Sequence, residues 1–172
     1  GSFCGISTPY KVYFVAEFNK PCIESGIWKE DDIYKGQTFS EGKNSGVFFT
    51  FAGTDSLLLY KIGISYVSVA NARENLKAEN NEWDFDKIKM AAIDKWNFYL
   101  GKIEADSDND DRLTQFYTHL YHALIHPNIC SDVNGDYMGA DNKIYRTRNK
   151  QYTSFSNWDA YRGQTQLLAM LA

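Results

Sequence analysis

The sequence contains little cysteine, proline or histidine. Its 172 residues include three residues of each type. The cysteines are widely spaced and form no C-x-x-C pair, so the pattern indicates neither a disulfide framework nor a zinc site. We therefore expect Cys4, Cys22 and Cys130 to be buried thiols that pack as small hydrophobic groups.

Basic charge and long apolar runs are also scarce. Lys and Arg number 18 against 22 Asp and Glu, a net charge of −4 without a basic block, which argues against a nucleic-acid partner. The longest apolar run is far shorter than the ~20 residues of a membrane span. The chain lacks an initiator Met, and the apolar helical run from Gln164 to Ala172 has no terminating residue. We expect the sequence to be a piece of a longer protein.

Aromatic residues, by contrast, make up 16% of the chain, and its first part has the two-residue period of β-strands. One strand face carries these residues: Tyr10, Val12, Phe14, Ala16 and Phe18. Further strands are predicted at Val47–Phe51 and Leu57–Val69, and Ile23–Ser45 is predicted to be connecting loops. This part of the chain is therefore expected to be antiparallel β-structure.

From Ser68 onward the period becomes helical. Ser68 and Asp84 are predicted N-caps, with Gly101 ending the second helix. A third helix is expected from Leu113 until shortly before Pro127. The segment Asp132–Arg146 is predicted to form a small hairpin, and a last helix to begin near Ser156. Strands followed by helices indicate an α+β fold without parallel βαβ units.

Three clusters resemble metal sites without completing one. The acidic stretches 106–111 and 132–136 lack the Gly and Glu that an EF-hand loop requires, so we expect solvated loops. His122 and His126 share a helix face but have no third ligand. We expect these two residues and His119 to be polar or capping side chains.

The richest stretch for chemistry runs from Tyr152 to Arg162. An indole such as Trp158 can stack on a sugar ring, while Asp159 and Arg162 can bind its hydroxyl groups. Ser156 and Asp159 also fit a helix capping box. The pattern therefore leaves Asp159 open as a cap, a sugar ligand or both.

Several blocks, this stretch included, resemble glycoside hydrolase family 92 in the family's order. They are YKVYFVAEF (Tyr10–Phe18), YKIGISYVSVANARENLKAE (Tyr60–Glu79), WDFD (Trp83–Asp86), FYTHLYHALIHPN (Phe116–Asn128), DVNGDYMG (Asp132–Gly139) and YTSFSNWDAYR (Tyr152–Arg162). The resemblance implies the C-terminal part of an antiparallel β-sandwich of the supersandwich type over residues 1–67. Linking helices would follow over 68–104, and the opening helices of an (α/α)6 barrel over 105–172.

The resemblance also implies an activity, inverting exo-hydrolysis of terminal α-mannose from mannans or N-glycans. Calcium would be the cofactor, with most of its ligands, the general acid and the general base beyond Ala172. In this chain the carried-over residues are substrate-binding ones, Trp158, Asp159 and Arg162, and none is catalytic. Mannose-containing glycans are the expected partners, and the expected location is the periplasm, the cell surface or the secreted fraction of a bacterium.

Two other functions stay open, a non-catalytic carbohydrate-binding or interaction module and a glycosidase of different sugar specificity. For the fragment alone we expect no activity. We also expect it to self-associate or to require the remainder of its chain, because its parts would leave apolar faces uncovered.

Overall fold

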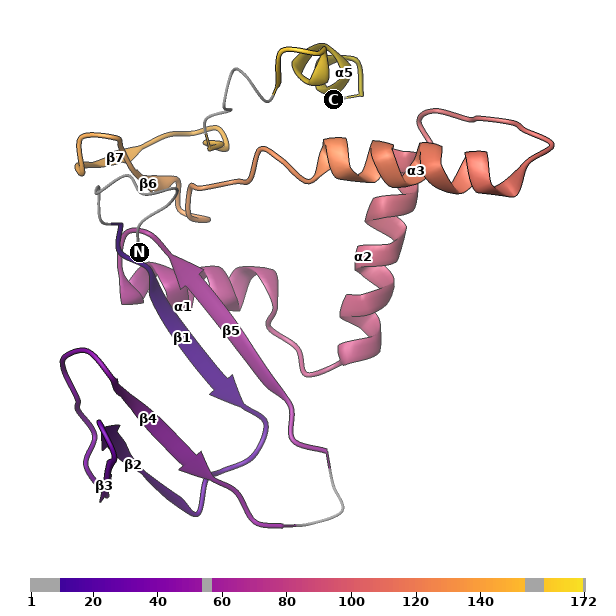
Figure 1. Cartoon of the computed structure of the whole chain (residues 1–172). Coiled ribbons are helices and arrows are strands. Elements are labelled where there is room, and N and C mark those ends of the chain that lie inside the picture. Colours follow the sequence, from indigo (N-terminus) through magenta and orange to yellow (C-terminus); the bar gives the residue numbers. More distant parts are fainter. Residues whose placement is uncertain (1–9, 54–56, 154–159, 172) are drawn as a thin grey trace. The chain divides into compact units, whose positions relative to one another are not determined.

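A computed structural model describes residues 10–53, 57–153 and 160–171 of the chain. It is an α+β structure, with most strands in the first part of the chain and the helices after them (Figure 1). The chain forms two compact units. The smaller is Ala16–Ile62, and the larger combines Gly1–Val15 with Gly63–Ala172.

The elements have the following bounds. The strands are β1 (Tyr13–Phe18), β2 (Glu24–Lys29), β3 (Asp32–Lys35), β4 (Ser45–Thr50), β5 (Tyr60–Ser65), β6 (Asp136–Met138) and β7 (Ile144–Arg146). The helices are α1 (Val69–Glu79), α2 (Phe85–Leu100), α3 (Asp110–Leu124) and α5 (Gln164–Leu171).

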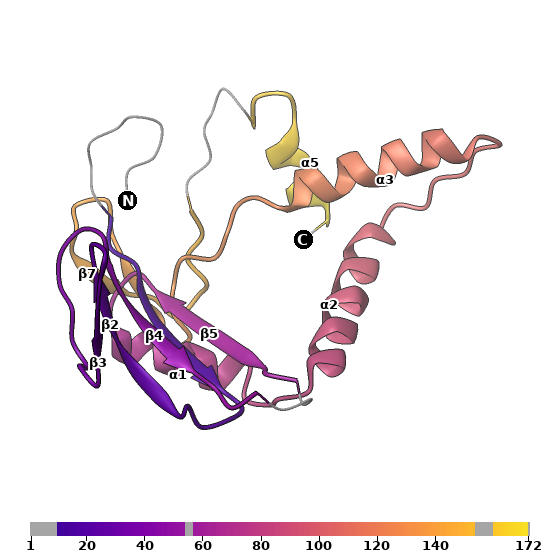
Figure 2. The same cartoon turned by 60° about the horizontal axis from the view of Figure 1, so that its bottom comes forward.

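The smaller unit contains an antiparallel sheet in the order β3–β2–β4 (Figure 2). The expectation of plain connecting loops over 23–45 is therefore wrong. Lys29 pairs with Asp32 across a tight turn in which Glu30 has a φ of 52°. Hairpin turns of this kind usually carry Asn or Gly, so Glu30 and Asp31 gave no turn pattern. The strand expected at Val47–Phe51 is confirmed as β4.

Strands β1 and β5 form a two-stranded sheet and run in opposite directions (Figure 1). The expected alternation is present in β1, but the predicted buried face is wrong. Val15 is buried, whereas Phe14 is 61% exposed. The reason is α1, since Val15 packs in one cluster with Ala72 and Leu76 of that helix. β5 is also shorter than the strand expected over 57–69, because the chain turns after Ser65 into the cap of α1.

Helix α1 lies unusually close to β5. A Cβ on Gly63 would meet the carbonyl oxygen of Ala72 and come within 2.6 Å of the Leu76 Cβ. Any larger residue at position 63 would therefore push the helix away from the strand. In β5 the small and polar positions, including Gly63 and Ser65, are on the buried side, and Ile64 is on the exposed side.

The two predicted helix caps are confirmed. The Ser68 hydroxyl accepts a hydrogen bond from the Asn71 N–H at 3.0 Å, and the Asp84 carboxylate accepts one from the Lys87 N–H at 2.9 Å. Gly101 ends α2 as expected. These helices therefore begin where a side-chain acceptor satisfies the first free N–H groups.

The later helices contact one another within the larger unit. The Trp96 ring of α2 lies 4.5 Å from the Tyr121 ring of α3, measured between centroids. The Gln164 side chain of α5 donates to the Ala123 carbonyl at 3.0 Å, and both views show α5 beside α3 (Figures 1 and 2). The expected helix start near Ser156 lies outside the described residues. The described α5 begins at Gln164, after Gly163 turns the chain with a φ of 96°.

Candidate functional site

Arg162 is the one predicted sugar-binding residue that the structure describes. Trp158 and Asp159 lie outside the described residues, so their predicted role stays a prediction. The Arg162 Nε donates to the Tyr161 hydroxyl at 2.7 Å, and its guanidinium lies 5.3 Å from the centroid of that exposed ring. Arg162 is thus held beside an aromatic face that is itself accessible to a ligand.

A more developed candidate site is a hollow of about 880 Å³, built within the larger unit. We call it the tyrosine hollow, because its aromatic lining is Tyr10, Tyr13, Tyr66, Tyr137 and Tyr152. Side chains that can form hydrogen bonds also line it, namely Lys11, Asn142, Gln151 and Thr153. Its size falls within the range of about 300–1,000 Å³ that is usual for small-molecule sites.

Distant parts of the sequence meet around this hollow. Tyr10 shortly precedes β1 and Tyr66 directly follows β5, and their rings meet edge to face at a centroid distance of 6.4 Å. Tyr152 is placed by an antiparallel bridge with Ile129. Hydrogen bonds of 2.8 Å from Cys130 N to Gln151 O and from Thr153 N to Asn128 O extend that pairing. Backbone pairing therefore fixes this part of the wall.

The predicted hairpin is confirmed as β6 and β7, and it supplies Tyr137. Tyr137 pairs with Tyr145 in the register of the hairpin, and their rings stack at 5.8 Å between centroids. The Tyr145 hydroxyl donates to the Asp141 carboxylate at 2.8 Å, which raises the pKa of Tyr145 and lowers the pKa of Asp141. These contacts hold the hairpin turn in one conformation beside the hollow.

A buried carboxylate joins this hairpin segment to α1 and β5. Asp132 accepts hydrogen bonds from the Ser65 hydroxyl at 2.7 Å, the Asn71 amide at 2.8 Å and the Asn75 amide at 2.7 Å. All four residues are buried, and we call them the Asp132 clasp. The expectation of a solvated loop is therefore wrong at Asp132. Its carboxylate is stable inside the protein because neutral donors surround it.

Asp136 makes a second connection in the same segment. Its carboxylate accepts from Arg146 Nε at 2.6 Å and from the Asn71 amide at 3.2 Å. The hydrogen bond from Arg146, followed by that from Asn71, holds the pKa of Asp136 below its ordinary value, although partial desolvation opposes the shift. Because Asp136 precedes Tyr137, this pair fixes the backbone from which that ring enters the hollow.

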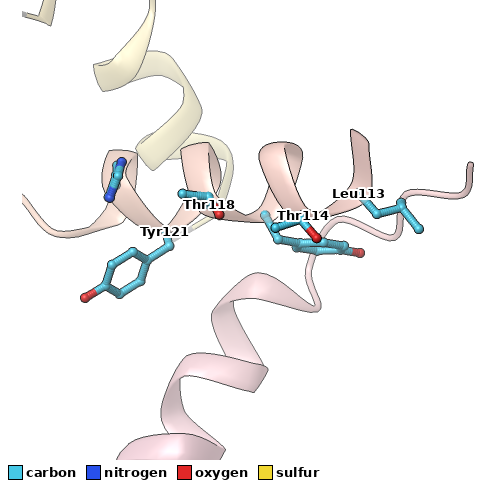
Figure 3. A pocket seen from close by; sticks show the side chains of 6 residues that line it. Leu113, Thr114, Thr118 and Tyr121 are labelled. Carbon is cyan, nitrogen blue, oxygen red and sulfur yellow. The ribbon is translucent and has the colours of Figure 1, made fainter. Parts of the chain in front are cut away.

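A second, shallower hollow of about 590 Å³ lies along α3. The side chains that line it all come from that helix, and Figure 3 shows several of them. They are Leu113, Thr114, Tyr117, Thr118, Tyr121 and His122. The ring of Tyr121 is already packed on Trp96, and the Tyr117 hydroxyl donates to the Ile103 carbonyl at 3.2 Å. A single helix face of this kind brings no paired catalytic groups together.

Two consecutive stretches of the sequence match the models of two domains of one protein family. Residues 1–65 match the glycosyl hydrolase family 92 N-terminal domain, and residues 71–172 match the glycosyl hydrolase family 92 catalytic domain. The chain belongs to glycoside hydrolase family 92. The resemblance carried by the sequence blocks is thereby confirmed.

Solved structures of family 92 resemble this one. An α-mannosidase of the family from Bacteroides thetaiotaomicron is 30% identical, with a TM-score of 0.80 over 92% of this chain and 22% of its own. An inverting mannosidase of the family from the same species is 27% identical, with a TM-score of 0.84 over the same shares. These matches confirm the α+β fold with antiparallel sheets. The expected barrel and the domain limits at residues 67 and 104 stay predictions.

A curated relative of the chain is described as an uncharacterized secreted glycosidase from Arthroderma benhamiae. It is 24% identical in an alignment of length 167 that covers 88% of this chain and 20% of the relative. The chain thus spans about a fifth of the length of these relatives.

The family's expected calcium does not fit the residues described here. Within residues 10–53, 57–153 and 160–171, no group of three or more His, Cys, Asp or Glu side chains could hold a metal ion. The acidic stretch 106–111 is instead used for capping, since Asn109 accepts from the N–H groups of Asp111 and Arg112. No step of a reaction is therefore assigned to calcium in this chain.

The cysteine prediction is wrong for the thiols that the structure describes. Cys22 is exposed and Cys130 is half-buried; Cys4 lies outside the described residues. Partial burial raises the pKa of the Cys130 thiol, which disfavours the reactive thiolate form. Cys130 also contributes to the lining of the tyrosine hollow.

Among the helices that the structure describes, none combines the length and apolar character needed to cross a membrane.

The sequence blocks contained the tyrosines of the hollow, but the blocks are far apart in the chain. The pairing of β1 with β5, the bridge between Ile129 and Tyr152 and the clasp around Asp132 bring them together. A pattern search along the sequence had no means of selecting those five rings.

Proposed function

We propose that this chain is part of an exo-acting α-mannosidase that hydrolyses terminal α-mannose from mannans or N-glycans with inversion. The observation that carries the proposal is the match to both family 92 domains, in order, along the chain. Support comes from structural neighbours described as an α-mannosidase and as an inverting mannosidase, which are 30% and 27% identical.

We further propose that these 172 residues alone do not catalyse the reaction. Inversion requires a carboxylic acid and a carboxylate about 6.5–9.5 Å apart on opposite sides of the sugar. Among the described residues, the lining of the tyrosine hollow includes no carboxylate, and the buried Asp132 carboxylate already accepts three hydrogen bonds. From the resemblance to family 92, we expect the general acid and the general base to lie beyond the position of Ala172.

Calcium belongs to the proposal for the longer protein. Because the described residues do not form a site for it, its ligands would come from other segments. Calcium in the longer protein would coordinate hydroxyl oxygens of the mannose and so orient the sugar. The expected result is that EDTA abolishes mannose release by the longer protein and that added Ca²⁺ restores it.

Export from a bacterial cell, to the periplasm, to the cell surface or into the medium, is the proposed location. The support is the relative from Arthroderma benhamiae, which is described as a secreted glycosidase. Cell fractionation of the source organism with an antibody against this chain tests it. Signal confined to the cytoplasm would contradict it.

The exposed apolar strand face supports the proposal that the chain alone self-associates or requires further segments. Phe14 is 61% exposed and Ile64 is 54% exposed on that face of β1 and β5. Analytical ultracentrifugation should show dimers or larger species, and Phe14→Ser should shift the distribution toward monomer. A strictly monomeric parent chain would contradict the self-association.

The decisive experiment measures mannose release. The 172-residue chain and the longer protein that contains it are each incubated with 4-nitrophenyl α-mannoside and with yeast mannan. We expect release only by the longer protein, with β-mannose as the first product in an NMR time course. Release by the chain alone would contradict the proposed inactivity, and α-mannose as the first product would contradict inversion.

A non-catalytic carbohydrate-binding module is the second candidate, because the tyrosine hollow offers ring faces and amides without an acid–base pair. Glycan affinity without turnover in the longer protein would favour it. A glycosidase of another specificity would instead release a sugar other than mannose.

A further inference from the structure

We propose that the tyrosine hollow is an accessory binding subsite for a neutral oligosaccharide, separate from the chemistry of hydrolysis. The choice of a mannose-containing chain as the ligand rests on the proposed function. The rest of the proposal depends only on the composition and rigidity of the hollow.

The composition favours a polyhydroxylated, uncharged ligand. A tyrosine ring stacks on the C–H face of a sugar, and its hydroxyl group both donates and accepts hydrogen bonds. Asn142 and Gln151 add amides that can pair with neighbouring sugar hydroxyls. Among the described residues, Lys11 is the one charged side chain in the lining, which is too little positive charge for a phosphate-rich ligand.

The same composition separates binding from catalysis. The lining includes no Asp, Glu or His side chain among the described residues. A glycosidic bond in the hollow would therefore meet neither a general acid nor a general base. The hollow can hold a glycan but cannot cleave it.

The walls are held in place before a ligand arrives. Tyr137 is stacked on Tyr145, and the adjacent Asp136 is bound by Arg146. Next to Tyr66, Ser65 donates to the buried Asp132 and accepts from the Val67 N–H at 2.9 Å. Rigid walls lower the entropic cost of binding.

The position in the chain fits an extended ligand. Gln151 and Thr153 line the hollow, and Trp158 follows Thr153 by a few residues in the sequence. A glycan held in the hollow therefore lies against the segment that leads into the predicted sugar-binding block. The hollow would bind part of the glycan away from the bond that is cleaved.

The test is a calorimetric titration of the 172-residue chain, and of the longer protein, with yeast mannan oligosaccharides. Tyr152→Ala should weaken binding by roughly tenfold, the size of one lost stacking interaction. Tyr152→Phe, which keeps the ring, should lose less. The matched control is Tyr34→Ala in β3, because Tyr34 is 40% exposed and Tyr152 is 46% exposed. This control should leave binding unchanged.

A second variant covers the case in which a tyrosine substitution disturbs folding. Asn142 has a φ of 60° in the hairpin turn, so Asn142→Gly removes the amide and keeps the backbone relaxed. It should weaken binding severalfold with an unchanged circular dichroism spectrum. Equal affinity in the parent, Tyr152→Ala and Asn142→Gly would overturn the proposal, as would an absence of binding by the folded chain and the longer protein.

Mannose release, measured separately, distinguishes this proposal from the proposed function. Release by the longer protein without tyrosine-dependent binding overturns the accessory subsite alone. Tyrosine-dependent binding without release supports the subsite and overturns the mannosidase proposal.

Discussion

Helices α1 and α2 have equally clear starting residues but very different surroundings. α1 buries Asn71, Ala72, Asn75 and Leu76, whereas α2 has no buried residue although it is five residues longer and richer in large apolar side chains. The more polar helix is thus the buried one. A cap and a periodic pattern determine that a helix forms, and the neighbouring elements determine which side chains it buries.

The largest expected effect comes from removing the carboxylate that binds α1 to the hairpin segment. Asp132→Ala leaves the donors of Ser65, Asn71 and Asn75 without their acceptor inside the protein. At ~1–3 kcal/mol for each unsatisfied group, we expect a loss of about 3–5 kcal/mol in the free energy of unfolding. Urea denaturation followed by circular dichroism measures it.

The matched control for this substitution is Asp106→Ala, since Asp106 is an exposed carboxylate in an acidic loop. It should change stability by less than ~0.5 kcal/mol. Equal effects of the two substitutions would show that the clasp does not hold α1 in place.

The second-largest expected effect is the difference in lost stability between a substitution in α1 and one in α2. Leu76→Ala in α1 should cost about 2–4 kcal/mol, because Leu76 is 3% exposed and packs with Val15 and Ala72. Ile88→Ala in α2 should cost less than ~1 kcal/mol, since Ile88 is 40% exposed. Denaturation of both variants in parallel checks the contrast, which a larger loss for Ile88→Ala would reverse.

The smallest expected effect concerns how the stability of the fold depends on pH. The pKa of Asp136 is lowered in the folded state, so this group stabilises the fold above its ordinary pKa of about 3.9. That contribution is lost as the pH falls through the lowered value. Arg146→Gln should move the Asp136 titration toward its ordinary range, as followed by carboxyl NMR.

Arg148→Gln is the control for the titration, because Arg148 is an exposed cation close by in the chain. It should leave the Asp136 titration where it is in the parent. An Asp136 titration curve that stays unchanged in Arg146→Gln would contradict the role of Arg146 in lowering this pKa.

Local patterns predicted much of the secondary structure. Ser68, Asp84 and Gly101 mark helix limits that the structure confirms, and the hairpin over 132–146 is present. The local patterns did not predict the hairpin turn at Glu30, whose left-handed backbone closes the hairpin without Asn or Gly. They also predicted the wrong buried face of β1, because Phe14 is exposed and the other face of the strand is buried. In both cases contacts with another element overrode the local preference.

For the candidate site, the sequence identified a sugar-binding block but not the tyrosine hollow. Arg162 is beside Tyr161 as neighbours in sequence, so its pairing is local. The rings of Tyr10, Tyr66, Tyr137 and Tyr152 come from segments that only the folded chain brings together. Asp132 could not be recognised as buried, because the donors that stabilise it are about 60 residues away in the sequence.

The sequence by itself determined the family, the α+β composition, the start of α1 and both limits of α2, because these depend on residue order and on contacts within a few positions. Tertiary structure decided which face of β1 is buried, why an aspartate can lie inside the protein and where five tyrosines surround a hollow. The physical reason is that burial and hydrogen-bond satisfaction depend on partners distant in sequence, and a carboxylate or a ring acquires its role only when those partners arrive.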